Sequence, residues 1–112
     1  MSLAVIPAWV APALWEVEAA REAAHALSDS LDGDSWKARA RAIDWALGQF
    51  PLSPVTGEYA EPTHQVVFAE MVVADSVAVR MPLPGAKTHD AVWGDAVAGV
   101  LGWLLGTRPG PA

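Results

Sequence analysis

The stretch that decides the fold is THDAVWGDAVAGVLGWLLG, residues 88–106. Thr88 is able to cap a helix, and Asp90 suits the positive end of the helix dipole. Gly106 fits the left-handed backbone position at which many helices end. The sequence therefore predicts a helix over about residues 89–105.

Apolar side chains surround almost the whole of this predicted helix. A helix with so little polar surface lies at the centre of a domain or is covered by another subunit. The main apolar stripe and the residues that widen it are Trp93, Val97, Val100 and Leu104, then Val92, Ala96 and Trp103.

Small residues recur inside the same helix, although each interior glycine costs about 1 kcal/mol relative to alanine. A ridge with a spacing of four lets another backbone approach closely, as small residues do in membrane helices. The partner of this ridge is either the first or second helix of the same chain or an identical subunit at a two-fold crossing. The second interpretation makes the chain a homo-oligomer with an interface at Gly94, Ala98, Gly102, Trp93 and Trp103.

Two amphipathic helices precede this segment, over about residues 12–31 and 35–49. A turn at residues 32–34 separates them, so they are expected to pack as an antiparallel hairpin. Pro12 suits the first turn of the first helix. The two apolar stripes are Val17, Ala20, Ala24, Leu27 and Leu31, then Trp36, Ala40, Ile43, Leu47 and Phe50.

Residues 63–81 have two interpretations. Thr63 and Pro82 fit the start and the stop of a helix, and the apolar residues between them follow helical spacing. The many valines favour strands, however, and a β-hairpin at about 65–81 would turn at Asp75-Ser76. Because that turn lacks the Gly or Asn that short hairpins prefer, a helix is the favoured prediction.

These elements predict one mainly α domain over residues 1–112, a small up-down bundle of about four helices. An α+β fold with the 65–81 hairpin is the alternative. Residues 1–11 form an apolar arm without the basic start of a secretory signal. Residues 51–62 contain three prolines and form a loop long enough to serve a function.

Composition excludes several classes of protein. The 112 residues include no cysteine, which removes disulfides, thiolate nucleophiles and Cys-based metal sites and suits the reducing cytoplasm. A net charge of −6 opposes broad nucleic-acid binding, since contacts from Lys and Arg to phosphate dominate that affinity. The longest apolar tract, 91–105, is too short to span a bilayer, so no membrane is expected. An apolar fraction of 53% with six tryptophans predicts a surface that meets a partner.

Candidate catalytic residues are few. Glu70 and Asp75 interrupt apolar stretches, and a buried carboxylate either serves as a general base or needs a structural partner, for which Arg80 is the candidate beside Asp75. His64 and His89 lie near predicted helix ends, without the spacing of a zinc site. We find no phosphate-binding or dinucleotide glycine motif and expect no cofactor or metal.

The sequence thus favours a non-catalytic interaction or accessory protein that self-associates and meets a protein partner. Its lack of Asn and its excess of Arg over Lys are typical of a GC-rich bacterial or phage genome. A small hydrolase or ligand-binding enzyme using Glu70, Asp75, His64 or His89 is the first alternative. The second is a DNA-associated regulator that uses the basic cluster Lys37, Arg39 and Arg41.

Overall fold

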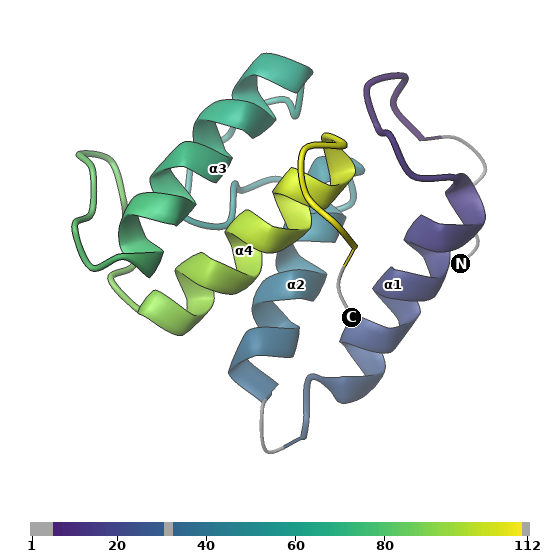
Figure 1. Ribbon diagram of the computed structural model, residues 1–112, viewed down its shortest axis with the longest axis horizontal. Coiled ribbons are helices and arrows are strands. Elements are labelled where there is room, and N and C mark those ends of the chain that lie inside the picture. The colour runs from purple at the N-terminus through teal and green to yellow at the C-terminus, as the bar shows by residue number, and fades with distance from the viewer. Residues whose placement is uncertain (1–5, 31–32, 111–112) are drawn as a thin grey trace.

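The computed structural model describes residues 6–30 and 33–110. In that part of the chain, four helices alternate in direction as an up-down bundle and no strand is present (Figure 1). One isolated antiparallel bridge joins Leu52 and Tyr59. The mainly α prediction is confirmed. The helices are α1 (Leu14–Leu27), α2 (Gly33–Ala46), α3 (His64–Ala78) and α4 (Ala91–Leu104).

The β-hairpin alternative for residues 65–81 is wrong, because α3 runs through the proposed turn. The hydroxyl of Thr63 accepts a hydrogen bond from the backbone N–H of Val66 and so caps the helix. Helical spacing then buries one face of α3. Its buried residues are Val67, Glu70, Met71, Ala74 and Val77.

Each helix is shorter than the apolar pattern predicted. α1 ends at Leu27, which is exposed, and the predicted end of its stripe at Leu31 lies outside the described residues. Of the predicted 32–34 turn, Asp32 also lies outside them, while Gly33 already begins α2. α3 ends three residues early, and Arg80 takes a left-handed backbone conformation (φ 61°) beyond it. Beyond the C-terminal ends of α1 and α3, apolar residues still follow helical spacing in the sequence. The two helices nevertheless end at Leu27 and at Ala78.

α2 and α4 lie at the centre of the domain. α4 packs against α3 and α2, whereas α1 packs chiefly against α2 (Figure 1). The predicted central position of the last helix therefore arises within one chain. Large side chains that are fully buried in this core include Ile43, Trp45, Val97, Leu101 and Leu104.

Two glycines of the small-residue ridge on α4, Gly94 and Gly102, have close neighbours within the chain. A Cβ atom added at Gly94 would lie 2.8 Å from the carbonyl oxygen of Ala74 and 2.9 Å from the backbone nitrogen of Ala78. The close neighbour of the ridge is therefore α3, not the first or second helix. Gly102 lies under the side chain of Arg108, and Ala98 is buried. Of the predicted interface residues, Gly94, Ala98 and Gly102 are therefore covered within the chain, whereas Trp103 lines a surface groove.

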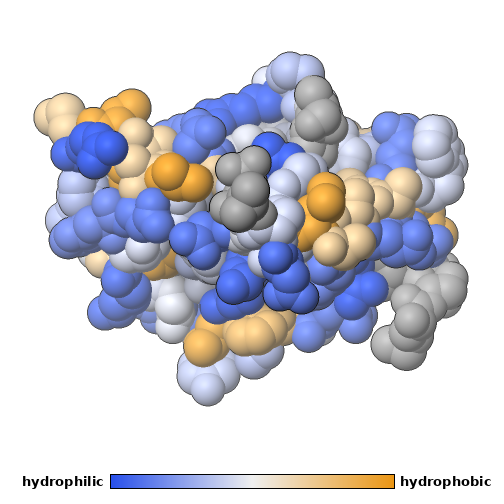
Figure 2. Space-filling model, turned by 90° about the horizontal axis from the view of Figure 1, so that it is seen from below, coloured by the Kyte–Doolittle hydropathy of each residue, from blue (hydrophilic) through white to orange (hydrophobic). Residues whose placement is uncertain are grey.

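No helix in the described segments is long and apolar enough to cross a bilayer. On the face shown in Figure 2, apolar groups form separate patches among polar side chains. Several large apolar side chains are nevertheless exposed, and the tryptophan at the start of α1, Trp15, is 72% exposed.

Candidate functional site

Glu70, a candidate general base, is buried and fully engaged by the 51–62 loop. Its Oε2 atom accepts hydrogen bonds from the backbone N–H groups of Val55 (2.6 Å) and Thr56 (2.9 Å). Its Oε1 atom accepts one from the Thr56 hydroxyl (2.7 Å). The carboxylate thus substitutes for backbone acceptors that the proline-rich loop lacks, which is a structural role.

Three indole groups also fix the 51–62 loop. The indole N–H of Trp9 donates to the carbonyl of Pro62 (3.0 Å), that of Trp45 to Ala60 (3.1 Å) and that of Trp93 to Pro54 (2.9 Å). These hydrogen bonds come from the N-terminal segment, α2 and α4. The loop is therefore held from several sides.

Arg41 lies beneath the same loop. Its guanidinium donates to the carbonyl of Leu52 (2.6 Å) and stacks on the ring of Phe50 at 3.8 Å. Burial lowers the pKa of Arg41, while the charges of Glu70 and Asp44 oppose that shift. Arg41 is consequently occupied by structural contacts.

Asp75 pairs with Arg108, not with Arg80 as the sequence suggested. The Nη2–Oδ2 distance is 2.5 Å, and the pair ties the C-terminal segment to α3. Arg80 cannot serve, because α3 ends before it and leaves it exposed in the left-handed conformation.

The four catalytic candidates do not form one site. Glu70 faces the loop, and Asp75 faces Arg108. His64 is exposed at the start of α3, and His89 is exposed two residues before α4 begins. Within residues 6–30 and 33–110, no group of three or more His, Cys, Asp or Glu side chains is arranged to hold a metal ion.

The Asp75–Arg108 pair gives a first testable prediction. Both side chains are more than one-third exposed, so solvent screens their attraction and Asp75→Asn should lower the free energy of unfolding by less than about 1 kcal/mol. Urea denaturation of the two proteins measures this difference. Stabilisation of the native protein by a divalent metal that is lost in Asp75→Asn would contradict the structural role.

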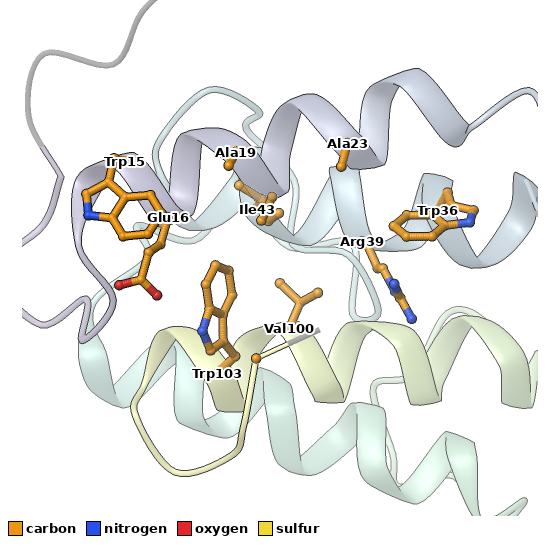
Figure 3. Close-up of a pocket in the computed structure, with 11 residues that line it drawn as sticks. Trp15, Glu16, Ala19, Ala23, Trp36, Arg39, Ile43, Val100 and Trp103 are labelled. Carbon is orange, nitrogen blue, oxygen red and sulfur yellow. The ribbon is translucent and has the colours of Figure 1, made fainter. Parts of the chain in front are cut away.

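The basic cluster Lys37, Arg39 and Arg41 does not form one face. Lys37 is exposed, Arg41 lies under the loop, and Arg39 extends from α2 toward α4 (Figure 3). Side chains that diverge in this way do not present a common surface to phosphates.

An apolar groove lies where α1, α2 and α4 meet. Its volume is about 420 Å³, which is in the range of ligand-binding clefts. Trp15 and Trp103 lie at one end, and Trp36 and Arg39 lie at the other (Figure 3). Among the described residues, the charged side chains of its lining are Glu16 and Arg39.

On the α1 side of this groove, three of the lining side chains are small alanines. Trp15, Ala19 and Ala23 are spaced by four, line the groove and are all exposed. The opposite side of α1 packs against α2 through Val17 and Ala24, which are buried. α1 therefore has a second apolar stripe that no other described segment covers.

Arg39 is the polar feature of the groove. Its guanidinium lies over the ring of Trp36, 4.3 Å from the ring centre. Its Nη1 atom is buried and has no hydrogen-bond partner among residues 6–30 and 33–110. A buried guanidinium nitrogen without an acceptor is unfavourable.

The sequence alone did not predict this groove. The spacing of Trp15, Ala19 and Ala23 was a visible signal, because it is a second stripe beside the one that contains Val17. The spacing along α1 could not show that this helix would leave one side of α4 uncovered.

No protein-family model, curated protein or solved structure matches the chain in comparisons with known proteins.

Proposed function

We propose that this protein is a non-catalytic binding protein that receives an amphipathic helix of a partner protein in the groove between α1 and α4. The observation that carries the proposal is the uncovered stripe of Trp15, Ala19 and Ala23, facing Trp103 across the groove. Aromatic side chains are the commonest anchors of protein interfaces, and the centres of such interfaces are poor in charge.

The shape of the groove favours a helix as the occupant. α1 and α4 both contact α2 but leave a space between them, and its floor is formed by Ile43. Alanines at a spacing of four allow another backbone to approach closely, which is how small residues act at helix crossings. Apolar side chains of the incoming helix, at spacings of three and four, would then meet Trp15 and Trp103.

A catalytic function has less support. Glu70 is the most buried carboxylate among the catalytic candidates, and both of its oxygens accept hydrogen bonds from the 51–62 loop. Asp75 is paired with Arg108. The absence of cysteine suits a partner in a reducing cytoplasm, and the composition suits a bacterial or phage setting.

A displayed library of 18-residue amphipathic helices tests the proposal, with binding measured by anisotropy of labelled peptides. Selected peptides are expected to bind the native protein at least about tenfold more tightly than the double variant Ala19→Gln with Ala23→Gln. The added side chains fill the α1 side of the groove without changing its charge. A tenfold loss corresponds to about 1.4 kcal/mol, a modest cost for blocking close approach.

The matched control is Ala69→Gln, at an exposed alanine of α3, which does not line the groove. Peptides that bind the double variant as well as the native protein would overturn the proposal. Light scattering tests whether the occupant is a second copy of the chain. The native protein would then be a dimer, and the double variant would be a monomer.

A further inference from the structure

Arg39 lines both the groove and a smaller hollow next to it. That hollow has a volume of about 180 Å³ and is lined by Asp95, Gly99 and Arg108 as well as Arg39. Arg108 is already bound to Asp75, and no ion pair joins Arg39 to Asp95 within the described residues. Among residues 6–30 and 33–110, the guanidinium of Arg39 is therefore the cation at this junction without an ion-pair partner.

Gly99 has no packing reason to be a glycine. Gly94 and Gly102 are each crowded by a neighbour, but a Cβ atom added at Gly99 meets nothing within 4 Å. The interior of a helix disfavours glycine relative to alanine. The one interior glycine of α4 that protein contacts leave unexplained is thus the one that lines the hollow beside Arg39.

We infer that Arg39 and the bare backbone at Gly99 form a seat for a carboxylate, so that the occupant of the groove is an apolar body carrying one acidic group. This inference rests on the proposed function of the groove. Arg39 lines both the groove and the hollow, and its guanidinium supplies charge-assisted hydrogen bonds to an anion there. The missing side chain at Gly99 leaves the room that the carboxylate needs.

The charges around the seat select a monoanion. Asp95 is exposed on α4 one turn before Gly99 and lines the same hollow. Its negative charge would repel a phosphate dianion more strongly than a single carboxylate. In the partner helix, the acidic group is accordingly an Asp or Glu side chain placed beside the apolar stripe.

A pair of small probes tests the seat without a partner helix. 4-Phenylbutyrate and its neutral amide, 4-phenylbutanamide, share the apolar body and differ in charge. Calorimetric titration should give at least about a tenfold preference for the acid, the size expected for hydrogen bonds to a charged group. Arg39→Gln should abolish that preference.

Gly99→Ala is the more specific test of the seat, because a glycine with a purely structural role would not combine higher stability with weaker binding of the acid. Its melting temperature should rise, while its affinity for the acid should fall at least about fivefold and its affinity for the amide should change less. A variant that is more stable and equally able to bind the acid would overturn the inference.

The outcomes separate the two proposals. Equal binding of acid and amide to the native protein, or no binding of either at millimolar concentration, overturns the carboxylate seat. The helix-library experiment decides the groove independently, since its readout depends on Ala19 and Ala23 and not on Arg39.

Discussion

Replacing Glu70 with leucine is expected to lower the free energy of unfolding by about 3–4 kcal/mol. Leucine keeps most of the buried volume but removes the acceptor for two backbone N–H groups, those of Val55 and Thr56. Each buried donor left without an acceptor costs roughly 1–3 kcal/mol, and the Thr56 hydroxyl loses its acceptor as well. Urea denaturation followed by circular dichroism measures the loss.

Glu70→Gln is the matched control. Its amide oxygen is able to accept both backbone N–H groups, and its NH₂ group is able to donate to the Thr56 hydroxyl, so most of the network can re-form. We expect a loss of about 1 kcal/mol, from the removed charge alone. If glutamine and leucine destabilise the protein equally, the charge of Glu70 matters more than its hydrogen bonds, contrary to the role assigned here.

The second large effect is expected at Gly94. Alanine at this position places a methyl group 2.8–2.9 Å from backbone atoms of α3, which are unable to move as a flexible side chain would. α3 and α4 must separate, and overpacking of this kind typically costs 1–3 kcal/mol. We expect Gly94→Ala to lower the free energy of unfolding by about 2 kcal/mol, despite the gain of about 1 kcal/mol in helix propensity.

The same helix contains the controls for this prediction. Gly99→Ala meets no neighbour and should stabilise the protein by up to about 1 kcal/mol. The three atoms nearest to a Cβ atom added at Gly102 all belong to the side chain of Arg108, which is able to move, so the effect of Gly102→Ala should lie between the other two. Equal effects at all three positions would mean that helix propensity, and not the close approach to α3, determines them.

The fold was predictable because it depends on local patterns. Apolar spacing located all four helices, and the lack of Gly or Asn at Asp75-Ser76 favoured a helix over a hairpin. The predicted cap of α3 at Thr63 is confirmed, whereas α4 is capped by Asp90 and not by Thr88. The ridge of small residues on α4 also indicated a close contact. Its partner, α3, was not predicted, because spacing along one helix does not say which neighbour lies against it.

The candidate site was less predictable for the same reason. Glu70 was recognised as a carboxylate in an apolar stretch, yet its partners are backbone groups of a loop that precedes it by 14–15 positions. The groove depends on where α1 lies relative to α4, and Arg39 was noticed only as part of a basic cluster. Features made by several segments require the tertiary arrangement.

The three indoles that hold the 51–62 loop have a practical consequence for spectroscopy. The chain has six tryptophans; Trp9, Trp45 and Trp93 donate to loop carbonyls, while the remaining three line the groove. The first set supplies indole protons that exchange slowly with solvent, and the second supplies resonances and emission that respond to an occupant. One unlabelled sample therefore reports loop attachment and groove occupancy through different indole N–H resonances.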